Sequence, residues 1–283
     1  MTTANNPLLQ ALNDLGFVYE VRYSAQGSPY AGLRWESVPA RALRAFTALY
    51  EAGALRLTLY APLGAGERLD ATTRLERVAE LPLVRLERGE DYPEMSNLTL
   101  ALPLEAEELT PALVRALLAH LASAGDWLVA DEQDGTGALA WPRVAGTPGA
   151  AVVETALSSL GLGWRVDEGR DGRVIDMGLP GLGVPGSFVV TTVDGGWVRV
   201  LARLRCGSAL TRARTSDDLT DRLQQWAPVG RFVHVVGDGV EQLAVEVAAP
   251  LVCARPEDAL AQALRSAVQL LGTAHKQAPV APT

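Results

Sequence analysis

The segment Ala11-Leu12-Asn13-Asp14-Leu15-Gly16-Phe17 recurs 145 positions later as Ala156-Leu157-Ser158-Ser159-Leu160-Gly161-Leu162. Further matches follow in the same order at offsets of 142 to 148 positions: Phe46 and Gly53 with Phe188 and Gly195, Arg74-Leu75 with Arg222-Leu223, and Pro103-Leu104 with Pro250-Leu251. Changes in loop length produce an offset that drifts by a few positions in this way. The order of the matches therefore favours two copies of one domain over a chance match of short apolar words.

The repeat sets the predicted domain boundaries. The first domain takes residues 1–130 and the second takes residues 150–276. The segment between them, 131–149, is acidic and then rich in glycine and proline, which is typical of a linker. Residues 277–283 form a short tail.

Each copy opens with a short amphipathic helix that ends at a glycine. Apolar residues at positions i, i+3, i+4 and i+7 give each helix one apolar stripe. These residues are Leu8, Ala11, Leu12 and Leu15 in the first copy and Val153, Ala156, Leu157 and Leu160 in the second. Gly16 and Gly161 follow, where a residue in the left-handed conformation would end the helix.

A block of strands comes next in both copies, because the segments are rich in β-branched and aromatic residues and are separated by turn residues. The predicted strands are 17–23, 33–37, 43–50 and 55–61 in the first copy, and 164–167, 173–177, 188–193 and 197–204 in the second. The alanines of 43–50 also suit a helix, but the matching segment 188–193 favours a strand.

Each copy then continues with a helix, two strands and a long final helix. Prolines end the predicted helices 71–81 and 217–226, and the later strands are 84–88, 98–102, 232–236 and 243–248. One final helix begins at Thr110-Pro111, and the other carries an apolar stripe over 260–271. The predicted fold class is α+β: a tandem repeat of an α-β-β-β-α-β-β-α domain, with helices packed on one face of an antiparallel sheet.

Composition restricts the classes of function. The chain has 283 residues and a net charge of −8, which excludes a strongly basic surface for nucleic acid. We expect neither a signal peptide nor a membrane-spanning segment, because polar residues interrupt every long apolar run, and we therefore expect the protein to be cytoplasmic. Cys206 and Cys253 lie in apolar contexts without a neighbouring ligand, so buried thiols are expected.

No motif predicts catalysis or a cofactor. Residues 181–186 satisfy GxGxxG, but a strand follows them instead of the helix that a dinucleotide site requires, so we interpret them as a loop. His120, His234 and His275 lie in different elements and have no metal-ligand spacing. The acidic run Glu105, Glu107 and Glu108 is interpreted as a solvated first helical turn. A hydrolase is disfavoured, since no nucleophile–base pair can be named.

The duplicated order of elements in an acidic chain resembles the YbjN-like family, whose fold is similar to that of the type III secretion chaperones. The resemblance covers nearly the whole chain and is carried by the element order and the repeat. It implies a non-enzymatic, chaperone-like accessory protein that holds an extended segment of a client protein and forms a homodimer, without a cofactor. The tandem fusion departs from the small single-domain chaperones, because two domains could pair within one chain.

Two residue sets are candidates for contacts with partners. Arg199, Arg203 and Arg205 alternate along one predicted strand and share a face, with Trp197 beside them. A solvated strand face is the simpler interpretation, but the stripe could instead bind an acidic client segment, or a single strand of nucleic acid in a regulatory accessory protein. The candidates for the homodimer interface are Leu219, Leu223 and Trp226, on a predicted short amphipathic helix.

Overall fold

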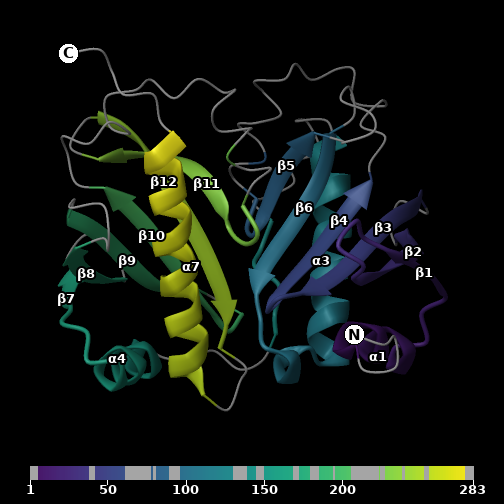
Figure 1. Cartoon of the computed structure of the whole chain (residues 1–283), viewed down its shortest axis with the longest axis horizontal. Helices are drawn as coiled ribbons and strands as arrows, with labels where there is room; N and C mark the ends of the chain where they lie inside the picture. Colours follow the sequence, from purple (N-terminus) through teal and green to yellow (C-terminus); the bar gives the residue numbers. More distant parts are fainter. Residues whose placement is uncertain are drawn as a thin grey trace. The chain divides into compact units, whose positions relative to one another are not determined.

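The chain forms two compact units in a computed structural model, Met1–Val144 and Ala145–Thr283 (Figure 1). The structure describes residues 6–37, 42–60, 78, 81–88, 96–129, 139–144, 150–167, 172–178, 185–193, 195–204, 223, 227–237, 240–251 and 255–277. The division between the units falls within the predicted linker 131–149. Of that segment the structure describes residues 139–144, in which Pro142 is buried.

The first unit contains one six-stranded antiparallel sheet. Its elements are α1 (Pro7–Asp14), β1 (Tyr19–Tyr23), β2 (Pro29–Ser37), β3 (Ala42–Glu51), β4 (Ala54–Tyr60), β5 (Val84–Arg88), β6 (Ser96–Pro103), the 3-10 helix η3 (Ala106–Glu108) and α3 (Pro111–Val129). The strands lie in the order β1-β2-β3-β4-β6-β5, so β1 and β5 are the edge strands.

The second unit also contains a six-stranded antiparallel sheet. Its elements are α4 (Ala150–Ser159), β7 (Arg165–Asp167), β8 (Gly172–Gly178), β9 (Pro185–Val193), β10 (Trp197–Leu204), β11 (Arg231–Gly237), β12 (Val240–Pro250) and α7 (Pro256–Gln277). The strand order β11-β12-β10-β9-β8-β7, read from its other end, has the same connectivity as the first sheet. Consequently β7 corresponds to β1, β10 to β4, β12 to β6 and β11 to β5.

The α+β class and the antiparallel sheets agree with the prediction, but the α-β-β-β-α-β-β-α pattern does not. Four strands, not three, follow the first helix of each unit. The predicted middle helices 71–81 and 217–226 lie mostly outside the described residues, and only Val78 and Leu223 are described there in helical conformation. The acidic run also differs, because Glu108 is buried and its carboxylate accepts a hydrogen bond from the Glu105 N–H at 2.8 Å.

Both opening helices end in the predicted left-handed glycine. Gly16 has φ +72°, and the Phe17 N–H donates to the Leu12 carbonyl at 3.0 Å. Gly161 has φ +66°, and the Leu162 N–H donates to the carbonyl five residues before it at 3.1 Å. This bonding satisfies a carbonyl that the helix end leaves open. Identical caps direct the chain from each helix into the edge strand β1 or β7.

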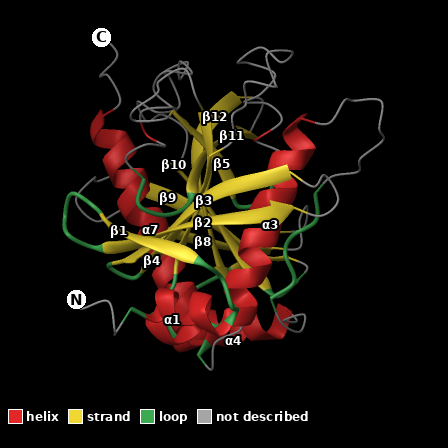
Figure 2. Cartoon of the chain, turned by 90° about the vertical axis from the view of Figure 1, so that its right-hand side faces the viewer, coloured by secondary structure: helices red, strands yellow, loops and turns green. Residues whose placement is uncertain are grey.

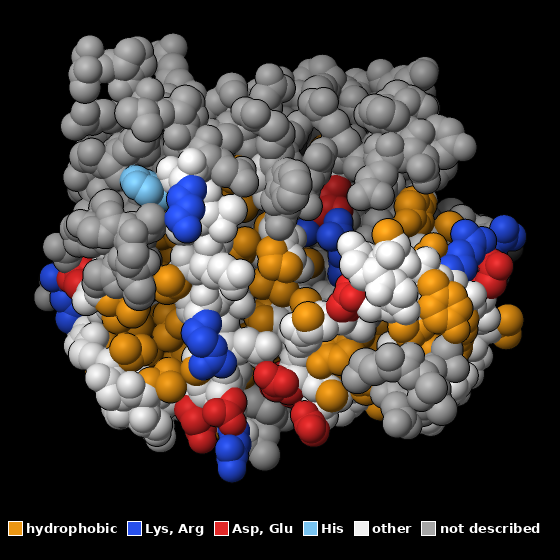
Figure 3. All heavy atoms as spheres, viewed as in Figure 1, with side chains coloured by type: hydrophobic (Ala, Val, Ile, Leu, Met, Phe, Trp, Pro, Cys, Tyr) orange, Lys and Arg blue, Asp and Glu red, His pale blue; other side chains and the backbone are white. Residues whose placement is uncertain are grey.

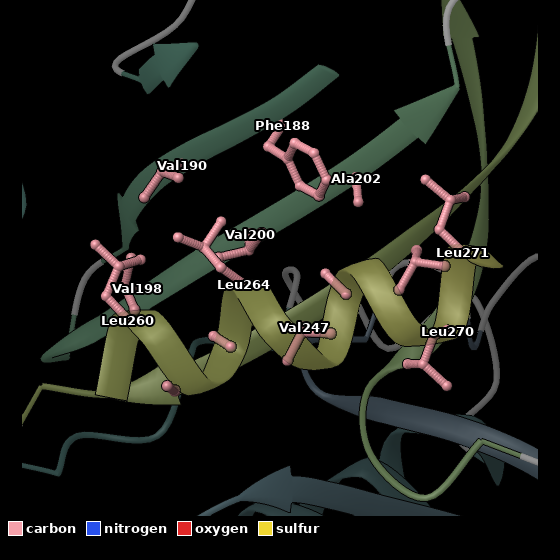
Figure 4. Packing of buried hydrophobic residues seen from close by; sticks show 14 of the residues in the cluster. Phe188, Val190, Val198, Val200, Ala202, Val247, Leu260, Leu264, Leu270 and Leu271 are labelled. Carbon is pink, nitrogen blue, oxygen red and sulfur yellow. The ribbon is translucent and has the colours of Figure 1, made fainter. Parts of the chain in front are cut away.

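Helices cover one face of each sheet. In the second unit the covered strands contribute Phe188, Val190, Val198, Val200, Ala202 and Val247, and α7 contributes Leu260, Leu264, Leu270 and Leu271 to the same buried cluster (Figure 4). In the first unit α3 contacts β4 and β6, where Leu57 and Leu100 are fully buried. Each long helix runs alongside the strands of its own sheet (Figure 2). Burial of each large aliphatic side chain stabilises the fold by about 1.5–3 kcal/mol.

Replacement of Gly230 with alanine tests the turn that leads into β11. Gly230 has φ +68°, and an added Cβ would lie 2.5 Å from the Glu246 carbonyl oxygen. We expect Gly230→Ala to lower the free energy of unfolding by roughly 2 kcal/mol or more, measured by urea denaturation. Gly163→Ala is the matched control, since a Cβ there meets nothing within 4 Å. Equal stabilities of the two variants would contradict the strained turn.

Candidate functional site

The predicted arginine stripe lies on the sheet face opposite α7, but its tryptophan is not accessible. Val198, Val200 and Ala202 of β10 are buried in the core with α7, which leaves Arg199 and Arg203 on the other face, as the alternation predicts. Trp197 is fully buried at 0% exposure, so it is a packing residue and cannot contact a client directly. Arg205 lies outside the described residues.

Arg199 belongs to a buried ion triad. Its Nε donates to Oε2 of Glu246 at 2.6 Å, and the Nε of Arg231 donates to Oε1 of the same carboxylate at 2.8 Å. The Glu246 side chain is 2% exposed and that of Arg231 is 9% exposed, whereas the Arg199 side chain is 37% exposed. One carboxylate on β12 therefore joins a buried arginine of β11 to a half-exposed arginine of β10.

The first unit has a triad of the same form. Arg85 donates from Nε to Oε1 of Glu87 at 2.7 Å, and Arg56 forms an ion pair with Oε2. The Thr99 hydroxyl also donates to Oε2 of Glu87, at 2.9 Å. Arg85 is 1% exposed and the Arg56 side chain is 35% exposed, so the division into a buried and a half-exposed arginine is repeated.

The arginines of the two triads occupy corresponding positions. Arg56 and Arg199 each lie two residues after the first residue of their strands, β4 and β10, and opposite an alanine of the next strand. Arg85 and Arg231 lie on the edge strands β5 and β11, opposite positions 99 and 246 of the next strand. Positions 99 and 246 are 147 residues apart, as are Pro103 and Pro250 of the repeat.

The carboxylate, in contrast, comes from different strands. In the first unit Glu87 lies on β5, and Thr99, which faces Arg85, occupies the position on β6 that corresponds to Glu246. In the second unit Glu246 lies on β12, and the position on β11 that corresponds to Glu87 is Val233. Both units thus form a triad of two arginines and one glutamate. The glutamate lies on the edge strand in the first unit and on the strand next to the edge in the second.

Burial and neighbouring charges shift the pKa of one group in each triad. Burial opposes the charge on Glu246, but Arg231 and Arg199 outweigh burial and hold the pKa of this carboxyl below its ordinary value. In the first unit burial lowers the pKa of the Arg85 guanidinium, an effect that Glu87 opposes and Arg56 reinforces. In each triad two guanidiniums lie around one carboxylate.

The sheet edges β1 and β7 form a second candidate surface. Among the described residues β1 pairs only with β2, and β7 pairs only with β8. Val21 of β1 is 37% exposed and Val166 of β7 is 56% exposed, and they are 145 positions apart, as the opening repeat is. Val18, immediately before β1, is 90% exposed. Both units therefore present an exposed valine on an edge strand at the same repeat position.

Both edge valines point to the helix-covered side of their sheets. Val21 shares a face with Tyr19, whose hydroxyl lies 3.0 Å from Oδ1 of Asn13, the residue before the last of α1. Val166 lies opposite Arg173, whose Nε donates to Oε1 of Glu154 on α4 at 3.0 Å. A strand added at either edge would continue the helix-covered face.

The predicted dimer residues do not form a described surface. Leu223 is 1% exposed and belongs to the core cluster of the second unit, so it is a core residue and not an interface residue. Leu219 and Trp226 lie outside the described residues. The apolar stripe of the predicted helix 217–226 suggests a partner surface, but Leu223 packs in the core of its own unit.

The remaining motifs do not assemble into a site in the part of the chain that the structure describes. His120 is buried, and its Nε2 lies 2.8 Å from the Pro82 carbonyl. Gly186 of the GxGxxG motif is in β9, whereas residues 181–184 and both cysteines are outside the described ranges. No group of three or more His, Cys, Asp or Glu in the described residues could hold a metal ion.

Searches against protein families, curated proteins and solved structures find no match for this chain. None of the helices in the described ranges has both the length and the apolar character needed to cross a membrane.

Moving the carboxylate between strands tests the equivalence of the triads. Glu246→Thr removes the carboxylate that the buried Arg231 and the half-exposed Arg199 share, so we expect the free energy of unfolding to fall by about 3–5 kcal/mol. Adding Val233→Glu places a carboxylate at the position of Glu87, and we expect the double variant to recover most of that loss in urea denaturation. A double variant no more stable than the single variant would contradict the equivalence.

Acid titration tests the charge state of Glu246. Its pKa is lower in the folded chain than in the unfolded chain, where a glutamate titrates near 4.3. The ion pairs therefore stabilise the fold above about pH 4.3, and this contribution is lost as the pH falls through the folded pKa. We expect the native protein to lose more free energy of unfolding than Glu246→Gln between about pH 6 and pH 3. Parallel losses in the two proteins would argue against an ionised Glu246.

Proposed function

We propose that this chain is a non-enzymatic, chaperone-like protein of the cytoplasm that holds an extended segment of a client protein by strand addition at β1 and β7. The observation that supports it best is the pair of exposed edge valines, Val21 and Val166, at one repeat position. The resemblance to the YbjN-like family and the secretion chaperones points in the same direction. Homodimer formation stays part of the proposal, through a surface other than Leu223.

Strand addition suits these edges because an edge strand has backbone N–H and C=O groups that its own sheet does not use. A client segment would pair with those groups, and its alternate side chains would contact the exposed valine and its neighbours. Tyr23, on the same face as Val21, is 61% exposed and extends the apolar contact. The proposed ligand is therefore an extended segment with apolar residues at every second position.

The two edges differ in length, which predicts a difference in affinity. β1 spans Tyr19–Tyr23, whereas β7 spans only Arg165–Asp167. A longer edge offers more backbone pairs, so we expect the first unit to bind the segment more tightly.

A nucleic-acid function draws less support. Arg199 is bound to Glu246, so it is not a free cation for a phosphate chain.

Hydrogen exchange with a defined peptide tests the proposal. The probe is a capped peptide of alternating threonine and valine with lysines at its ends, and the control peptide has proline at its central positions. We expect the probe to slow amide exchange in residues 19–23 and, less strongly, in 165–167, because new backbone hydrogen bonds form there. Unchanged exchange at both edges on saturation with the probe would refute strand addition.

An edge substitution tests the contribution of the valine. Burying one valine is worth about 1.5 kcal/mol, or roughly tenfold in the dissociation constant. We expect Val21→Lys to weaken binding of the threonine–valine peptide by about that factor, measured by fluorescence anisotropy. Val18→Lys is the matched control, since Val18 lies outside β1. Equal losses in both variants would assign the effect to added charge and not to the strand.

A further inference from the structure

We propose that the edge strand β1 binds β1 of a second copy of this chain, and that the two strands pair antiparallel about Val21. This assignment rests on the homodimer of the proposed function and names the surface that forms it. A two-fold axis at Val21 places Tyr19 opposite Tyr23 of the second copy. It also places Glu20 opposite Arg22 of the second copy, once on each side of the axis. The sheet of the first unit then continues from one chain into the other.

The backbone of β1 has the groups that such pairing requires. Among the described residues β1 pairs only with β2. The Ser24 N–H donates to the Ser28 carbonyl at 2.9 Å, so the backbone groups of Ser24 point toward β2. Because these directions alternate along an antiparallel strand, the N–H and C=O groups of Tyr19, Val21 and Tyr23 point away from β2. Each of these residues can exchange two hydrogen bonds with the residue opposite it in the second copy.

The side chains of β1 are accessible to a second copy. Val21 and Tyr23 are exposed on one face of the strand, and the Glu20 and Arg22 side chains are 69% and 58% exposed on the other. Figure 3 shows apolar, acidic and basic side chains together at the surface on the side of the first unit where β1 lies. Pairing about Val21 brings the two valines together and puts Tyr23 against Tyr19 of the second copy. Cross-strand pairs of this kind stabilise a sheet.

The order of charges along β1 is self-complementary. Glu20 precedes Val21 and Arg22 follows it, so antiparallel pairing about the valine puts each carboxylate opposite a guanidinium. Within one chain Nη2 of Arg22 lies 2.8 Å from Oε2 of Glu20. The dimer joins two such ion pairs into a network of four alternating charges. Charged side chains on an edge strand usually keep other strands away, but this order of charges does not repel its own copy.

The charges of β7 disfavour it as the strand that pairs with β1. In β7 the order is reversed, with Arg165 before the exposed valine and Asp167 after it. Antiparallel alignment of the two edge valines would place two carboxylates opposite each other, Asp167 and Glu20. It would also place two guanidiniums together, Arg165 and Arg22. Since like charges directly opposite each other are destabilising, β1 fits a second β1 better than it fits β7.

A second copy and a client segment compete for β1, because one strand edge holds one added strand at a time. The dimer is therefore the form of the protein without a client, and client binding at β1 separates the two copies. Stable interfaces bury about 1,200–2,000 Å², and one pair of short strands is at the low end of this range or below it. We accordingly expect a dissociation constant on the order of 10–100 μM.

Charge reversal tests the pairing by sedimentation velocity at low salt. We expect the native chain to change from monomer to dimer between about 1 and 300 μM. Arg22→Glu puts carboxylates at both opposed positions, and Glu20→Arg puts guanidiniums there, so each variant should weaken the dimer by about tenfold or more. An equimolar mixture of the two variants restores opposite charges at every opposed position. It should form a heterodimer as readily as the native chain dimerises, which also shows that both variants are folded.

Arg165→Glu is the matched control, because it makes the same change of charge as Arg22→Glu on the other edge strand, at a side chain that is 70% exposed. It should leave the dimer unchanged. A native chain that stays monomeric over this range, or a mixture that stays monomeric, would overturn the proposal. An equal loss of dimer in the control would also overturn it, since general charge repulsion would then account for the effect.

The threonine–valine peptide separates self-pairing from client binding. We expect saturating peptide to convert the native dimer to monomers, because both occupy β1. Peptide that slows amide exchange in residues 19–23 while the dimer stays intact would overturn self-pairing at β1 and leave the proposed function in place. A dimer that follows the charge substitutions, without protection by the peptide, would support self-pairing and count against client binding.

Discussion

Burial of one apolar sheet face beneath helices is the constraint on which both units depend. Alternation along a strand sends every second side chain to that face, so the register of β10 is fixed by the burial of Val198, Val200 and Ala202 against α7. A slip of one residue would put Arg199 into the core. The helix caps at Gly16 and Gly161 contribute to this burial, because they turn the chain from the covering helix into the edge strand.

The opposite face of each sheet carries an ion triad. Buried arginines on it would be costly alone, and in both units a single glutamate reduces that cost. Since the glutamate lies on β5 in one unit and on β12 in the other, the constraint acts on the charge and position of the triad and not on one strand. The edges β1 and β7 present different groups, namely the backbone N–H and C=O groups of an edge strand and one exposed valine each.

Patterns within single elements predicted the fold well, and contacts between distant strands were missed. The strands 84–88 and 197–204 agree with β5 and β10 to the residue, because the alternation there is strong. The start of β2 at Pro29 was placed four residues late, since Pro29, Ala31 and Gly32 have weak strand propensity. Trp197 was assigned to the correct strand but not to the interior, because alternation does not show what covers a face.

The triads were missed for a related reason. Glu246 is one of the polar residues that interrupt the apolar runs of the sequence, yet it is buried between arginines that are 47 and 15 positions away. A lone glutamate within a strand as apolar as Leu243–Pro250, together with arginines at matching positions of both repeats, is the signal that could have revealed it. Leu223 shows the opposite error, since an apolar helix stripe does not distinguish a core from an interface.

Site-specific photo-crosslinking in living cells tests the central claim, that the sheet edges hold client polypeptides. A benzophenone amino acid would replace Val21 or Val166 at the edges, and Arg265 on the exposed side of α7 as the reference position. The account predicts crosslinks to a discrete polypeptide from the two edge positions and none to that polypeptide from position 265. Crosslinks of equal yield at all three positions, or none at either edge, would contradict it.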